Sequence, residues 1–162
     1  ELLAEQGFLY DSNALDDVQL TWLRDRLGAT TQPWKVLFFH HPAYSSGMHG
    51  STPVVQRAIE PIVREFGVQL VLSGHDHDYE RFAPMNDQGE RDEARGIRSF
   101  VVGTGGAKLY ELEQRHPLSQ AWQNTSWGVL KLVLRRDGYD WEFLPAANGE
   151  FRDAGSAHCV RR

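Results

Sequence analysis

The sequence predicts a single α/β domain, and three observations lead to this fold class. Leucines recur at helical spacing in residues 16–27, a strand–helix–strand unit spans residues 34–72, and a hairpin pattern spans residues 127–145. The 162 residues are enough for one domain with a sizeable core, and they contain no internal repeat or heptad pattern. One domain is therefore the simplest interpretation of the chain.

The first predicted helix comprises residues 16–27. Its Leu20, Leu23 and Leu27 lie on one face, and two aspartates begin it where the helix dipole favours negative charge. Gly28 follows as a stop signal. A short apolar run at residues 34–39, WKVLFF, then predicts a buried strand.

The strand–helix–strand unit continues through residues 53–66, a second predicted helix with one apolar face. Thr52 is a suitable N-cap for it, and Pro61 is expected to kink or divide it. Residues 68–72, VQLVL, predict another buried strand. Because such a crossover makes its two strands parallel, their carboxyl ends should meet at one edge of the sheet, where ligands bind in α/β proteins.

Beyond residue 96, the regular elements that the sequence predicts are β-strands. Residues 97–103 predict a strand, and residues 107–126 are expected to be irregular. The turn sequence Arg136-Asp137-Gly138 separates the two β-rich runs of the hairpin at residues 127–145. The polar tail from residue 146 is expected to be loose.

The composition excludes several classes of protein. A hydrophobic fraction of 41% and a charged fraction of 24% are typical of a globular chain, not a disordered one. The net charge of -5 argues against general nucleic-acid binding, which needs a basic surface. No stretch approaches about 18 consecutive apolar residues, so no membrane span is predicted. The single cysteine, Cys159, says nothing about the redox compartment.

Histidines gather at the predicted edge of the sheet. His40 and His41 follow the first strand directly, and His75 and His77 follow the second one closely, with His49 in the loop between. Neutral imidazole is the commonest metal ligand, so this grouping predicts a metal site. In an extended segment His75 and His77 would point the same way, which suits two neighbouring ions better than one. Two metal ions bound side by side form a known type of site that cleaves phosphoesters.

A two-ion site also needs oxygen ligands, above all a bridging carboxylate. Asp76 and Asp78 are available, but strand alternation turns Asp76 away from the face that carries its histidine neighbours. Both aspartates are therefore interpreted as structural or as supports for the ligands. Glu80 and Arg81 are expected to pair and to brace the same loop, and His116 is expected on the surface.

The stretches FFHHPAYSSGMHG and VLSGHDHDYERF resemble the C-terminal half of a calcineurin-like metallophosphoesterase, nearest to the purple acid phosphatase branch. The motifs that carry the resemblance are H-x-P-x-(Trp/Tyr) from His40 to Tyr44 and G-H-x-H from Gly74 to His77. The resemblance implies half of a four-layer α/β/β/α sandwich with a mixed sheet. In the complete enzyme it implies two divalent or trivalent metal ions, of iron, zinc or manganese.

The same resemblance assigns roles to the histidines. It implies that His40 and His75 bind one metal ion and His77 the other. It implies that His49 lies beside the phosphate of the substrate and donates a proton. His41 either supports the ligands, lines the substrate entrance or belongs to the surface.

The sequence also departs from the family pattern. The motifs G-D-x-G, G-D-x-x-Y and G-N-H-(Asp/Glu), which supply the family's other ligands, do not occur before His40. We therefore expect residues 1–162 to be a single partial catalytic domain, its C-terminal portion, with the N-terminal half missing.

Three hypotheses about function follow. The first is metal-dependent hydrolysis of small-molecule phosphoric esters, as in acid phosphatases, through a binuclear centre. The second is a module in which His40, His75 and His77 bind one zinc ion. The third is an inactive fragment that self-associates through an exposed sheet edge. An extracellular or periplasmic location is implied by the resemblance alone.

Overall fold

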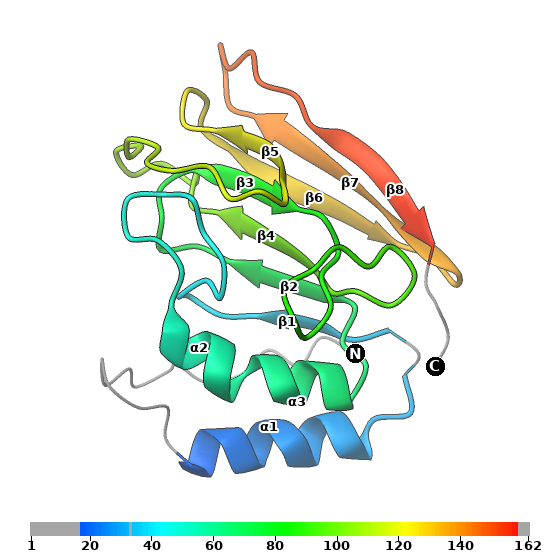
Figure 1. The fold of residues 1–162 in the computed structure, drawn as a ribbon. Coiled ribbons are helices and arrows are strands. Elements are labelled where there is room, and N and C mark those ends of the chain that lie inside the picture. Colours follow the sequence, from blue (N-terminus) through cyan, green and yellow to red (C-terminus); the bar gives the residue numbers. More distant parts are fainter. Residues whose placement is uncertain (1–16, 33, 159–162) are drawn as a thin grey trace.

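The computed structural model describes residues 17–32 and 34–158, which form three layers (Figure 1). A layer of helices covers one face of a five-stranded sheet, and a three-stranded sheet covers the other face. The predicted α/β class and the mixed sheet are confirmed. In the described part of the chain, no helix covers the outer face of the three-stranded sheet, where Val129 is 57% exposed.

The helical layer follows the sequence pattern closely. Helix α1 spans Asp17–Ala29, and the second predicted helix is divided at Ile59 into α2, Pro53–Ala58, and α3, Glu60–Glu65. Pro61 lies in the first turn of α3, where its missing N–H costs nothing. The predicted division is therefore confirmed. Among the described helices, none is long and apolar enough to cross a membrane.

The five-stranded sheet has the order β1-β2-β4-β3-β5. Strands β1 (Val36–Phe38), β2 (Leu70–Ser73) and β4 (Arg98–Val102) run parallel, which confirms the predicted crossover. Strands β3 (Tyr79–Phe82) and β5 (Ser119–Gln123) run antiparallel to their neighbours, and neither was predicted. Both are short and carry charged or amide side chains, so they lack the apolar alternation of a typical strand.

The three-stranded sheet is antiparallel. The predicted hairpin is formed by β6 (Gly128–Leu134) and β7 (Gly138–Pro145). The expectation that the tail is loose is wrong, because β8 (Ala154–His158) pairs with β7. Its sequence AGSAH has no large apolar side chain, so nothing in its hydrophobic pattern indicates a strand.

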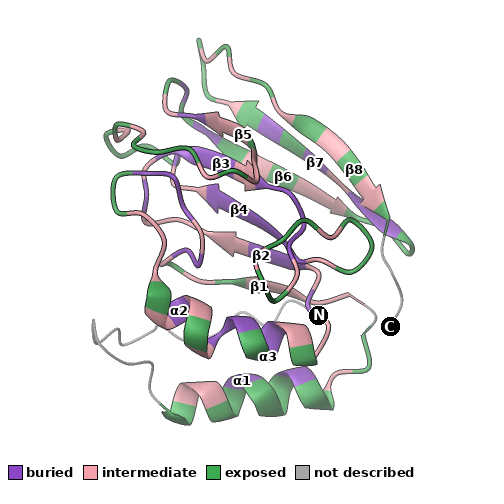
Figure 2. Ribbon diagram, viewed as in Figure 1, coloured by how far each residue is buried: buried purple, intermediate pink, exposed green. Residues whose placement is uncertain are grey.

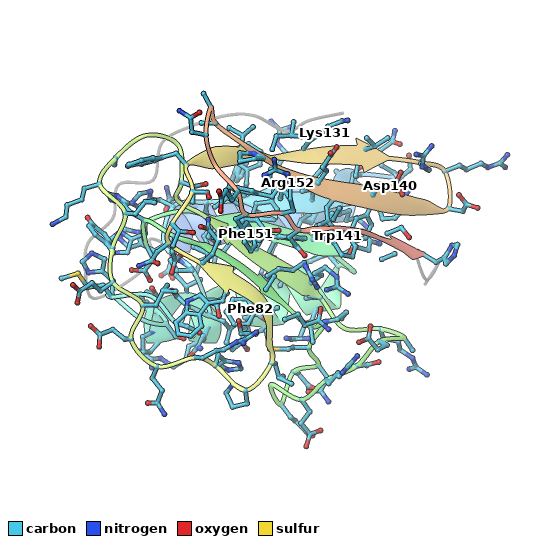
Figure 3. All side chains as sticks on the ribbon, turned by 90° about the horizontal axis from the view of Figure 1, so that it is seen from above. Phe82, Lys131, Asp140, Trp141, Phe151 and Arg152 are labelled. Carbon is cyan, nitrogen blue, oxygen red and sulfur yellow. The ribbon has the colours of Figure 1, made fainter. Side chains whose placement is uncertain are left out.

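Two large hydrophobic cores hold the layers together, and a smaller cluster contains Phe82, Met85 and Val101. In Figure 2 the helices turn buried residues toward the sheet and exposed residues away from it. Strand β2 shows why both faces of the sheet are apolar: Val71 packs toward the helices, whereas Leu70 and Leu72 pack toward the second sheet. Figure 3 labels Trp141 and Phe151, which both belong to the core between the sheets.

A polar network crosses this second core. The Asp153 carboxylate accepts hydrogen bonds from the Tyr79 hydroxyl (2.6 Å), the Arg81 Nε (2.8 Å) and the Trp141 Nε1 (3.1 Å). The expected pairing of Glu80 with Arg81 is therefore wrong. Adjacent strand residues point to opposite faces, so Arg81 turns to Asp153 while Glu80 turns to the histidine loops.

Candidate metal centre

The histidines lie where the parallel strands end. The loops after β1, β2 and β4 gather at the same edge of the sheet, on the left of Figure 1. The His40 Nε2 and His75 Nδ1 atoms are 3.1 Å apart, although 35 positions separate these residues in the sequence. The crossover therefore brings the two sequence motifs together.

Three imidazoles form the centre of this cluster. His40, His41 and His75 can each offer one nitrogen, and these nitrogen atoms all lie within 4.8 Å of one another. The ring centroids of His41 and His75 are 4.2 Å apart. Nitrogen ligands of a zinc ion lie about 2.0–2.1 Å from it, and imidazole is a common ligand of zinc and iron. The donor set therefore fits a transition metal ion.

The electrostatics of the cluster favour neutral imidazoles. Burial, followed by the neighbouring His41, His49 and His40, lowers the pKa of His75 to about 4. Burial and the same neighbourhood also lower the pKa of His41. Only the neutral ring can coordinate a metal ion, so these side chains are in the binding-competent form at neutral pH.

The backbone of the second motif is not extended. His75 has a φ of 64°, in the left-handed region that residues other than glycine rarely adopt. The premise that His75 and His77 alternate along a strand is therefore wrong. The turn at His75 brings its ring against His40 and His41, and His77 turns to another loop.

His77 is oriented by a backbone carbonyl. Its Nδ1 lies 2.8 Å from the Lys108 carbonyl oxygen, which can only accept, so Nδ1 donates and Nε2 carries the lone pair. This tautomer is the usual arrangement of a histidine that binds a metal ion. The ring stacks on Tyr110, with centroids 4.0 Å apart and 13° between the planes. His77 does not belong to the three-histidine group.

His49 lies beside the cluster, at an exposed position of its loop. Its ring centroid is 4.5 Å from that of His75 and 5.3 Å from that of Tyr110. Its backbone N–H donates to the Asp76 carboxylate at 2.8 Å. The structure thus brings His49 to the three-histidine group, with the side chain accessible from outside.

Two buried carboxylates hold the loop that carries His49. Asp76 also accepts a hydrogen bond from the Ser45 hydroxyl, and Glu80 accepts from the Ser46 N–H at 2.7 Å. Gly47 is required here, since a Cβ would come within 2.6 Å of the Asp76 side chain. The interpretation of Asp76 as a supporting residue is consistent with these bonds.

Asp78 has a different environment. It is completely buried, and neither of its carboxylate oxygens has a hydrogen-bond partner among the described residues. Burial, followed by the charges of Glu80 and Asp76, raises its pKa to about 8. In the described ranges no aspartate or glutamate joins the three-histidine group, so the ligands found there are all nitrogen atoms.

Some features of the site have no sequence signal. His116, expected on the surface, is half-buried, with its ring 5.4 Å from Phe82 and its Nδ1 accepting the Leu118 N–H. Tyr110 stands in a segment with no motif, so the sequence gives no indication of its place beside the histidines. The bond from Asn124 to the Tyr110 carbonyl links two loops and is equally invisible in a single sequence.

Comparisons with known proteins agree with this architecture. The family model of the calcineurin-like phosphoesterases matches residues 3–79. An acid phosphatase of Aspergillus ficuum is 35% identical over 158 residues, covering 84% of this chain and 26% of its own length. Purple acid phosphatase 17 of Arabidopsis thaliana is 43% identical over 72 residues, covering 44% of this chain and 19% of its own length.

A solved structure shows the same fold. Purple acid phosphatase PPD1 from yellow lupin seeds superimposes with a TM-score of 0.74 at 23% identity, covering 85% of this chain and 28% of that chain. The fold and these matches relate the chain to the calcineurin-like phosphoesterases. Within that class it is related to the purple acid phosphatases. The chain spans about a quarter of the length of the relatives it matches.

Proposed function

We propose that this chain supplies the histidine ligands of a binuclear metal centre, and that this centre hydrolyses phosphoric monoesters of small molecules. The observation that carries the proposal is the convergence of His40, His41 and His75 at the carboxyl edge of the sheet, in a chain related to purple acid phosphatases. His40 and His75 would hold one ion and His77 the other, each through a ring nitrogen. The ions would be iron, zinc or manganese.

When bound, two such ions clamp the oxygens of a phosphoryl group and provide a hydroxide nucleophile at neutral pH. The residues of this chain would then orient the ester. His49 can donate a hydrogen bond or a proton to the phosphate, because its ring is exposed and contacts His75. His41 would line the entrance beside it. The hydrogen bonds from Ser45 and His49 to Asp76 would hold the His49 loop during turnover.

We further propose that residues 1–162 are the C-terminal portion of a larger catalytic domain. The support is that this sequence lacks the three family motifs that carry oxygen ligands, and that its relatives are much longer. Those ligands would come from the rest of the domain. An extracellular or periplasmic location is also a proposal, and it rests on the family resemblance alone.

One observation favours a second candidate, a single-ion site. The three nitrogen donors that already lie within 4.8 Å of one another belong to His40, His41 and His75. A zinc ion held by three histidines keeps one open position for water or a ligand. In this alternative His77 is not a ligand.

Metal content distinguishes the two candidates. We expect elemental analysis of the full protein, purified without chelators, to find two ions per molecule, and the His77→Ala variant to retain one. A single ion that survives His77→Ala but is lost in His41→Ala would favour the single-ion site. We also expect the full protein to hydrolyse a chromogenic phosphate monoester, with loss of activity in His40→Ala; no hydrolysis by the loaded protein would refute the proposed function.

A further inference from the structure

Tyr110 is the one aromatic side chain found against both His77 and His49 in the described part of the chain. Its ring lies flat on the His77 imidazole, at 4.0 Å between centroids. The same ring meets His49 at 5.3 Å with 80° between the planes. These two histidines stand on different loops, and Tyr110 stands on a third loop, between β4 and β5. Tyr110 therefore links them physically.

The backbone of Tyr110 is fixed on both sides. Its N–H donates to the His77 carbonyl at 3.1 Å, and its own carbonyl accepts from the Asn124 side-chain amide at 2.6 Å. Two residues earlier, the Lys108 carbonyl accepts from the His77 ring at 2.8 Å. The backbone that carries the Tyr110 ring is thus hydrogen-bonded to the G-H-x-H motif and to Asn124, the residue just after β5.

The His49 ring has much weaker support of its own. Its backbone is held by Asp76, but in the described residues its ring contacts are with His75 and Tyr110. The residue is exposed and follows Met48, which is 56% exposed. A side chain in this setting samples several rotamers unless neighbouring rings restrict it.

We infer that Tyr110 is a positioning residue that holds the His49 imidazole against His75, and so presents it to the substrate phosphate. The inference rests on the proposed function of His49. Removal of the Tyr110 ring would leave His49 free to turn away while the three-histidine group stays intact. The aromatic ring of Tyr110, and not its hydroxyl, holds His49 in place, because both contacts are made by the ring.

The first test is independent of catalysis. In the chain labelled at histidine, we expect the NMR signals of the His49 imidazole to be displaced by the Tyr110 ring current. Tyr110→Phe should keep this displacement, and Tyr110→Ala should move the His49 signals toward those of a free histidine. Leu109→Ala, a change at the next residue of the same loop, is the matched control and should leave them unchanged. Unaltered His49 signals in Tyr110→Ala would overturn the inference.

The second test uses a double-mutant cycle with inorganic phosphate and the metal-loaded full protein. Aromatic contacts of this kind correspond to a roughly two- to tenfold change in affinity, so Tyr110→Ala should weaken phosphate binding by about that factor, and Tyr110→Phe should not. In the His49→Ala background Tyr110→Ala should have a smaller effect than in the wild type, because both changes remove the contact between His49 and Tyr110, and the effect that remains comes from the stacking on His77. Additive losses would overturn the inference. A wild-type protein that binds no phosphate would instead refute the proposed function, and the NMR signals would still decide whether Tyr110 holds His49.

Discussion

Replacement of Asp76 should weaken both the fold and the His49 loop. The side chain is completely buried, and its two oxygens accept hydrogen bonds from the Ser45 hydroxyl and the His49 N–H. A hydrogen bond to a charged group contributes about 1.5–3 kcal/mol, so the two bonds set an upper limit of about 3–6 kcal/mol. Water can reach the exposed His49 and replace one partner, which reduces the expected loss for Asp76→Ala to about 2–4 kcal/mol.

Urea denaturation measures this loss directly. The midpoint should fall while the slope stays the same, because the surface exposed on unfolding does not change. The melting temperature should fall by about 5–15 °C, since each kcal/mol corresponds to about 2–4 °C in a domain of this size. Asp76→Asn keeps the shape and one acceptor and should lose less than half as much. Asp87→Ala, at an exposed position, is the control and should change stability by less than about 0.5 kcal/mol. A loss below about 1 kcal/mol for Asp76→Ala would refute the role given to this carboxylate.

Three further predictions concern single groups. The His75 imidazole of the metal-free protein should titrate near pH 4 by NMR, and a midpoint near 6.5 would contradict this. The unfolded ring binds its proton near pH 6.5. His75 should therefore make the fold less stable as the pH falls from about 6.5 to 4. Asp78→Asn should stabilise the fold by about 1–3 kcal/mol at pH 8. The pKa of the buried carboxyl is raised to about 8, so its ionisation favours unfolding as the pH rises from about 4 to 8. The free energies of unfolding from denaturant titrations at pH 5 and pH 8 should therefore differ less for the variant than for the wild type. Phe38 is 49% exposed on β1, which is an edge strand, so Phe38→Lys should reduce any concentration-dependent association seen by sedimentation; equal association in both proteins would exclude this edge as the contact.

The fold could be predicted from the sequence where apolar periodicity determines an element. The helix divided at Ile59, the parallel pair β1 and β2, and the hairpin of β6 and β7 all follow from such patterns. Strands β3 and β5 could not be predicted, because their polar side chains are satisfied by distant partners. Arg81, for example, bonds to Asp153, which lies 72 positions away.

The candidate site likewise has some features that the sequence predicts and others that it does not. The crossover predicted that His40 and His75 meet, and they do. The left-handed backbone of His75 is imposed by tertiary contacts, so the arrangement that joins His41 to the group could not be derived from spacing. Tyr110 reaches His77 across 33 positions by means of backbone bonds, and backbone bonds leave no mark on residue identity.

The position of β4 has a consequence for the order in which the site is assembled. The loop that carries His75 and His77 joins β2 to β3. Strand β4 lies between these two strands in the sheet, although it comes later in the chain. Just after β4, the chain passes so close beneath the loop that a Cβ on Gly103 would lie 1.8 Å from the Asp76 carbonyl oxygen. A nascent chain that ends before Arg98 would therefore contain every histidine of the cluster without β4, the strand that lies beside their loop. During synthesis, metal-binding geometry should be acquired only after β4 has been inserted, and a chain interrupted earlier should capture metal ions poorly.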